Sequence, residues 1–189
     1  MVNTLANAHR LLRYAQTEAP SPGQDVGEKD AALIDKIRGQ GIHLTGVVVS
    51  VPDGDGIKCR GTVGVVSIRL LGLDAPEIWQ PNAQPQKHAI ESQRILARLV
   101  HAQRVVCICD TLQPRLDRYG RLLAYIIRQD DELLVNAELL RQGAARAFPA
   151  FPCRLTADFA HLEATARRAR VGIWAPGGGG EQTANLVLS

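Results

Sequence analysis

Residues 47–59, VVVSVPDGDGIKC, decide the fold. Val47, Val49 and Val51 fall at every second position, which is typical of a strand with one buried face. The Asp- and Gly-rich residues 52–56 then predict a tight turn, and residues 57–59 predict a return strand. Residues 63–73 predict a third strand, so this part of the chain is expected to form an antiparallel meander.

The rest of the chain alternates between helical and strand patterns. Apolar residues recur at helical spacing in residues 85–100, 135–142 and 156–170. Two further strands are expected over residues 104–110 and 119–128. This order predicts an α+β domain, mainly β, built as a five-stranded barrel with three packed helices. It is the layout of an OB-fold, which by itself does not settle a function.

We expect one domain with appendages, because 189 residues, 46% of them hydrophobic, suffice for one compact core. The domain is predicted to span residues 43–175. Residues 1–42 are interpreted as an appendage, with a helix around residues 4–16, a linker at residues 18–24 and a second short helix that carries Leu33, Ile34 and Ile37 on one edge. Residues 176–189, which include four consecutive glycines, are expected to form a flexible tail.

The composition narrows the class of protein. A net charge of +3, with arginines gathered in the second half, suits a polyanionic partner. The four cysteines include no C-x-x-C pair and match no histidine spacing, so no zinc site is expected. Cys107 and Cys109 lie two apart in an apolar run, so they are predicted to share one face of a strand as small core residues. The first 19 residues carry polar groups throughout, and no later stretch could span a bilayer, which predicts a cytoplasmic protein without membrane contact and leaves secretion open.

The candidate chemistry lies in residues 69–77, RLLGLDAPE. Arg69 lies within an apolar strand, and the carboxylates of Asp74 and Glu77 follow where that strand ends. A half-buried arginine is costly unless it meets an anion, which can be a structural carboxylate or a bound phosphate. The turn with Asp53 and Asp55 adds carboxylates, and the segment 117–121, DRYGR, adds two arginines that can bind a phosphate through two hydrogen bonds each.

Three motifs in this order resemble the staphylococcal nuclease (thermonuclease) family: the DGD turn at 53–55, the R-L-x-x-x-D-x-P-E segment at 69–77 and the D-R-Y-G-R segment at 117–121. The likeness continues through Tyr125, LRQG at 140–143 and GIW at 172–174, and it covers about residues 43–174. The resemblance implies a Ca²⁺-dependent nuclease that hydrolyses phosphodiester bonds of DNA and RNA, favours single strands and leaves 3′-phosphate ends. We also expect a monomer.

The resemblance assigns a role to each matching residue. Asp55, Asp74 and the backbone carbonyl of Ala75 would hold one Ca²⁺, because a hard cation prefers oxygen ligands, and Asp53 would support them. Glu77 would activate the water for in-line attack. Arg69 and Arg121 would bind the scissile phosphate and offset the charge that develops on it. Further contacts to substrate are expected from Arg118, Tyr119, Phe148 and Phe151.

Three departures from the family pattern qualify these roles. Gly56 and Ala75 stand where many members have Thr, but neither change removes a ligand. Phe148 and Phe151 follow the Q-G motif where several members have tyrosines. A phenylalanine can stack on a base but cannot donate a phenolic hydrogen bond, and both rings could instead belong to the core. Tyr119 is then the remaining phenolic donor.

Two other functions compete with an active nuclease. The first is a catalytically inactive OB-fold module that binds nucleic acid, and the second is a protein-interaction module with a basic rim. Degenerate relatives usually lose carboxylates or arginines, whereas this chain has acids or arginines at all five expected positions. The complete set favours the enzyme.

Overall fold

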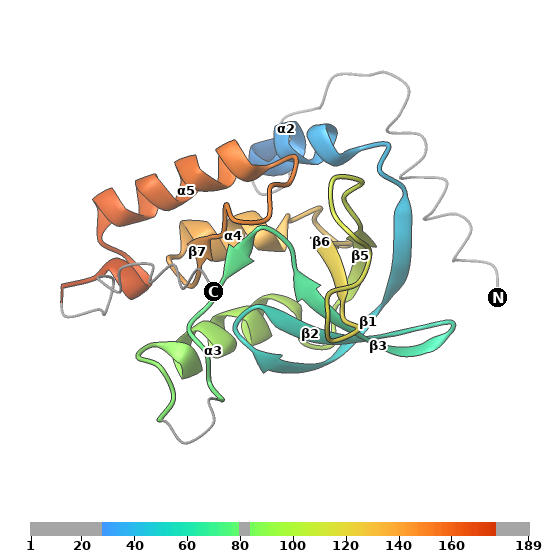
Figure 1. Cartoon of the computed structure of the whole chain (residues 1–189), viewed down its shortest axis with the longest axis horizontal. Helices are drawn as coiled ribbons and strands as arrows, with labels where there is room; N and C mark the ends of the chain where they lie inside the picture. Colours follow the sequence, from blue (N-terminus) through green and yellow to red (C-terminus); the bar gives the residue numbers. More distant parts are fainter. Residues whose placement is uncertain (1–27, 80–83, 177–189) are drawn as a thin grey trace.

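The computed structural model describes residues 28–79 and 84–176. Its centre is a closed barrel in which five strands follow one another in the order β1-β2-β3-β6-β5 (Figure 1). The elements, in chain order, are α2 (Glu28–Ile37), β1 (Ile42–Asp53), β2 (Gly56–Gly61), β3 (Gly64–Leu70), β4 (Leu73–Asp74), α3 (Ala89–Val100), β5 (Arg104–Ile108), β6 (Leu122–Arg128), α4 (Val135–Arg141), β7 (Arg146–Ala147), α5 (Thr156–Ala169) and the 3₁₀ helix η1 (Gly172–Trp174).

The predicted meander is confirmed. β1 and β2 pair antiparallel through a tight turn that places Asp53 opposite Gly56, and β2 and β3 pair antiparallel along their whole length. The barrel is completed by β6, which runs parallel to β3, and by β5, which joins β6 to β1. The five-stranded barrel and the three helices α3, α4 and α5 therefore stand as the sequence predicts.

The third strand differs from the prediction at its end. It stops at Leu70, and the chain turns at Gly72, which has φ +78°. The next two residues form β4, which leaves the barrel and pairs with β7, so that Asp74 lies opposite Arg146. The predicted continuous strand over residues 63–73 is wrong because its last part pairs with a partner that lies about 70 residues later in the chain.

Some motif residues hold the fold together. The buried Tyr125 donates its hydroxyl hydrogen to Asp110, at 2.6 Å. The side chain of Asn136 accepts a hydrogen bond from the Ile126 amide and donates one to the Leu71 carbonyl. At Gly143, which has φ +62° as the helix end requires, an added Cβ would lie 2.3 Å from the carbonyl oxygen of Val171. Cys107 and Cys109 are free and buried, which confirms the prediction that they are core residues, and Cys59 and Cys153 are free and buried as well.

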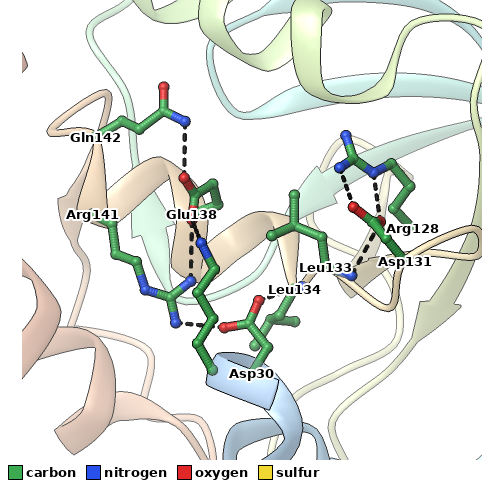
Figure 2. A network of polar contacts seen from close by, with 9 residues as sticks. Asp30, Arg128, Asp131, Leu133, Leu134, Glu138, Arg141 and Gln142 are labelled. Carbon is green, nitrogen blue, oxygen red and sulfur yellow. Dashed lines mark hydrogen bonds and ion pairs between the residues drawn. The ribbon is translucent and has the colours of Figure 1, made fainter. Parts of the chain in front are cut away.

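Helix α2 is packed against the domain. Ile37 is fully buried in the core, and Lys36 binds Asp158 of α5, the helix beside α2 in Figure 1. Asp30 is also fully buried; it pairs with Arg141 of α4 and accepts a hydrogen bond from the Leu134 amide at 2.8 Å (Figure 2). This part of the predicted appendage is therefore an integral layer of the structure.

Other predictions on the flanking segments lie outside the described residues. These are the helix around residues 4–16, the linker at 18–24 and the tail after 176. The domain boundary at residue 43 stays a prediction. Among residues 28–79 and 84–176, no helix combines the length and the hydropathy that a membrane crossing needs.

Candidate active site

The turn between β1 and β2 positions the first carboxylates. Gly54 lies so close to the chain after β4 that an added Cβ would be 2.7 Å from the Cβ of Ala75. Only glycine allows this approach without displacing a neighbour. The next residue, Asp55, is consequently buried, with 1% of its side chain exposed, and its Oδ2 accepts a hydrogen bond from the Ala75 amide at 2.8 Å. Gly56 has its nearest neighbours 3.9 Å from an added Cβ, so the turn has room for the Thr that other members carry.

Arg69 joins two of the predicted metal ligands. It lies opposite Gly56 on the neighbouring strand, and its guanidinium contacts Asp55 and also Asp74 Oδ1, at 2.7 Å. Its side chain is only 15% exposed. Burial would lower the pKa of Arg69, but the charges of Asp55 and Asp74 outweigh it and raise that pKa. The guanidinium therefore stays charged, and it offsets the cost of burying Asp55.

The electrostatics favour protonation of two acids in this site, Asp55 and Glu77. Burial raises the pKa of Asp55 to about 6, against the opposing effect of Arg69. Burial also raises the pKa of Glu77 to about 7, together with a hydrogen bond to Asp53 and the negative charges of Asp53 and Asp55. A carboxyl with a pKa near neutrality can accept a proton and release it again at working pH, which is what a general base requires. Asp53, which was predicted to support a metal, thus contacts the predicted base.

The backbone at Glu77 is held by a residue that sequence reasoning missed. The Glu77 amide donates to Gln86 Oε1 at 3.0 Å, and the Gln86 amide donates to the Glu77 carbonyl at 2.9 Å. These two hydrogen bonds close the base of the loop between the two residues. Because the contact depends on the path of that loop, no local pattern in the sequence could have identified it.

The turn before β6 presents the second arginine. Asp117 accepts hydrogen bonds from the amides of Tyr119 and Arg121, both at 2.9 Å, and from Arg121 Nε at 2.7 Å. Burial would raise the pKa of Asp117, but these hydrogen bonds outweigh it and lower that pKa. Arg121 lines a pocket that Asp53 also lines, so the third motif meets the first at the barrel surface. Tyr119 is 68% exposed, with its ring 5.4 Å from the Arg121 guanidinium, and its hydroxyl accepts a hydrogen bond from Arg118.

The structure does not bring the two phenylalanines into this pocket. Phe148 donates its backbone amide to the Gly72 carbonyl and lines a different pocket against α5. Phe151 is 60% exposed, and its ring centre lies 5.6 Å from that of Phe148. The rings form an exposed aromatic pair beyond β7, so the interpretation of both as core residues is wrong. Their predicted contact with substrate stays a prediction.

The pocket lining includes polar and aromatic side chains that sequence reasoning did not single out, among them Lys58, Ser67 and Trp79. Lys58 and Ser67 face each other on β2 and β3, on the outer side of the barrel. Trp79 lies two residues after Glu77 and is 78% exposed. The alternation of Ile57, Lys58 and Cys59 was the signal that Lys58 points outward.

Among residues 28–79 and 84–176, no group of three or more His, Cys, Asp or Glu is arranged to hold a metal ion. The predicted donor set nevertheless suits a hard cation. Asp55 Oδ1 is buried and meets Arg69, and Asp74 Oδ1 faces the same guanidinium. Two carboxylates therefore converge on one positive centre, and all the expected ligands are oxygens.

Comparison with known proteins gives the family. Residues 67–176 match the family described as staphylococcal nuclease homologue. The chain belongs to this family. It is 30% identical, over 70% of its length and 72% of the relative's, to an uncharacterized protein of Methanocaldococcus jannaschii. Membership in the staphylococcal nuclease family supports a nuclease function.

Two other relatives have names that state an activity. The SPbeta prophage-derived endonuclease YokF of Bacillus subtilis is 30% identical over 67% of this chain and 42% of its own length. A thermonuclease of Staphylococcus intermedius is 34% identical over 53% of this chain and 58% of its own length. The chain thus spans about half the length of these two nucleases.

Proposed function

We propose that the protein is a Ca²⁺-dependent nuclease that hydrolyses phosphodiester bonds of DNA and RNA and leaves 3′-phosphate ends. One observation carries the proposal: the carboxylates of Asp55 and Asp74 meet on Arg69 at one rim of the barrel, and Arg121 shares a pocket with the adjacent Asp53. Phosphodiester hydrolysis needs an oriented water and positive charge around the phosphorus. This rim supplies a candidate base and two arginines.

The arginines bind and orient the phosphate. Arg121 is about one third exposed, so its guanidinium can reach a phosphate that enters the pocket while Asp117 holds its Nε. Arg69 is held by Asp55 and Asp74, and its remaining donors would bind the same phosphate. Fixed guanidinium groups stabilise the charge that builds on the phosphate oxygens in the transition state, because they need no reorganisation at that moment.

Glu77 acts as the general base. Its carboxylate accepts a proton from the attacking water, the water oxygen bonds to phosphorus, and the bond from phosphorus to the 5′-oxygen breaks. The 5′-oxygen takes a proton from solvent, which leaves a 5′-hydroxyl and a 3′-phosphate. The hydrogen bonds to Gln86 fix the backbone that carries this base. A positioned base of suitable pKa contributes roughly 10²- to 10⁴-fold in rate.

The cation would be held by Asp55, Asp74 and the Ala75 carbonyl, with Asp53 in support. When bound, Ca²⁺ supplies positive charge to a phosphate oxygen and so complements the arginines. Arg118 and Tyr119 would contact the neighbouring part of the substrate. A single strand fits best, because an exposed ring such as Tyr119 can stack only on an unpaired base.

A metal-titrated cleavage assay tests the proposal. Purified protein is incubated with single-stranded DNA, duplex DNA and RNA over a range of Ca²⁺ concentrations, with chelator controls and analysis of the product ends. Ca²⁺-dependent cleavage to 3′-phosphates, fastest on single strands, supports it. Tight DNA binding at low salt without cleavage under any divalent ion favours the inactive binding module instead.

A further inference from the structure

The pocket that Asp53 and Arg121 line extends beyond the candidate active site, along the outer face of β2 and β3. Its volume is 340 Å³, within the roughly 300–1,000 Å³ range of small-ligand sites. Arg121 forms one border of the pocket, and Trp79 and Ile78 come from the segment just after Glu77. Tyr119 contacts Arg121 but does not line the pocket. The pocket therefore extends from Arg121 to a region that Tyr119 does not contact.

The lining of this pocket combines a flat apolar surface with positive charge. Trp79 leaves 78% of its surface exposed, and Pro52 and Ile78 add apolar groups. Lys58 and Arg121 supply two positive charges against the single negative charge of Asp53, and Ser67 adds a hydroxyl. An aromatic ring beside cationic groups is the combination that binds a base together with its phosphate.

The pairing of the strands fixes the order of these groups. Lys58 lies opposite Ser67 on β3, and two residues further along the same strands Gly56 lies opposite Arg69. Residues two apart on a strand point to the same face. Lys58 thus continues, along the outer face of the barrel, the row of charged groups that begins at Arg69. A chain of phosphates that passes Arg69 and Arg121 would meet Lys58 next.

We propose that this pocket binds the nucleotide next to the scissile phosphate on the side away from Tyr119, with its base stacked on Trp79 and its backbone phosphate on Lys58. The inference rests on the proposed nuclease function. It makes Trp79 a specificity-determining residue that selects for an unpaired base at this position. Because Trp79 is exposed, its replacement leaves the fold intact.

The test uses a short single-stranded DNA with one cleavable phosphodiester and two analogues that lack the base on one side or on the other. On the intact substrate, Trp79→Ala raises KM about 10-fold and Trp79→Phe changes it little, as expected for base stacking on an aromatic ring. On one of the two analogues, the KM of the wild type is raised by the same factor of about 10, and Trp79→Ala does not raise KM any further. Lys58→Gln raises KM, whereas Arg60→Gln, on the same strand but outside the pocket, does not.

Two results would overturn the inference. One is an unchanged KM in Trp79→Ala. The other is an equal increase in KM in Trp79→Ala on all three substrates, which would indicate a general effect on the segment after Glu77. If the wild type cleaves nothing, the proposed function fails separately. The same comparison is then made by binding of fluorescently labelled oligonucleotides, where loss of the base-dependent contribution in Trp79→Ala supports the pocket and its persistence contradicts it.

Discussion

Arg69 of β3 forms an ion pair with the buried Asp55, the residue before β2, and the strand register brings the two close because Gly56 lies directly opposite Arg69. The same guanidinium also binds Asp74. A planar group with several donors can serve two carboxylates and still face a phosphate. A lysine has the same charge but only three donors on one nitrogen, so it cannot contact both carboxylates and also bind a phosphate through two parallel hydrogen bonds.

We therefore expect Arg69→Lys to lower kcat by about 100-fold or more, as for the loss of a donor to a developing oxyanion. Steady-state cleavage of single-stranded DNA measures the effect. The control is Arg60→Lys, an exposed arginine on β2 outside the pocket. Near-wild-type turnover in Arg69→Lys would show that charge alone is needed at this position.

Calcium binding should be visible without any substrate. A ligand that binds only the folded state raises its stability, by about 2.7 kcal/mol at 100 times the dissociation constant. We expect millimolar Ca²⁺ to raise the Tm of the wild type, and to have little effect on the Tm of Asp55→Asn or Asp74→Asn. Asp158→Asn, which alters a surface ion pair with Lys36, keeps the full response. An undiminished response in the first two variants would place the ion elsewhere.

The contact between α2 and α4 predicts a stability effect far from the active site. Asp30 is fully buried and pairs with Arg141, which also contacts Glu138 at 3.2 Å (Figure 2). Removal of one partner of a buried pair leaves the other charge uncompensated, although Glu138 offsets part of that loss. We expect Asp30→Ala to lower the free energy of unfolding by about 3 kcal/mol in urea denaturation.

The matched control on the same helix is Asp35→Ala. Asp35 pairs with Arg38 at the surface, and 59% of its side chain is exposed. Asp35→Ala should therefore lower the free energy of unfolding by less than about 0.5 kcal/mol. Equal effects of the two substitutions would mean that α2 is not anchored through Asp30.

The ion pair between Arg128 and Asp131 predicts a pH dependence of stability. Hydrogen bonds from Arg128 lower the pKa of Asp131 below its ordinary value of 3.8. A carboxyl with a lowered pKa in the folded state stabilises the protein above its ordinary pKa, and this contribution is lost as the pH falls through the folded-state pKa. Asp131→Asn should therefore lower the free energy of unfolding by about 1 kcal/mol at pH 7 and by less at pH 3. The value at pH 7 takes account of the partial exposure of this ion pair.

Urea denaturation of the wild type and the variant at pH 7, 5 and 3 measures this difference. Asp130→Asn, in the same turn, provides the comparison. A difference that stays constant or grows toward pH 3 would contradict the assignment of the stabilising contact to ionised Asp131.

Most of the barrel and of the site could be predicted because their signals are local. The alternation in β1, the DGD turn and the apolar strand around Arg69 each depend on neighbouring residues. The features that the sequence did not reveal depend on contacts between distant residues. Leu73 and Asp74 pair with β7, and Asp30 reaches Arg141, 111 positions away, so neither could be recognised from a short segment.

The candidate site likewise contains residues that a local motif predicted and residues that no motif indicated. Asp55, Arg69, Asp74 and Glu77 lie together as their motifs predicted. Trp79 and Gln86 were missed because neither belongs to a motif in the sequence, and their roles follow only from the pocket that Trp79 lines and from the hydrogen bond between Gln86 and Glu77. The surroundings of Phe148 could not be predicted from its place after the Q-G motif, because the pairing of β4 with β7 puts Phe148 in a pocket against α5.

The role of Glu77 is tested most directly by Ca²⁺-dependent cleavage of denatured DNA by Glu77→Gln, beside the wild type and the exposed control Glu91→Gln. The substitution removes a proton acceptor and keeps the shape of the side chain. We expect cleavage to fall by roughly 10²- to 10⁴-fold in Glu77→Gln while DNA binding and Tm stay near those of the wild type and Glu91→Gln cleaves normally. Cleavage by Glu77→Gln at the wild-type rate would contradict the assignment of Glu77 as the base.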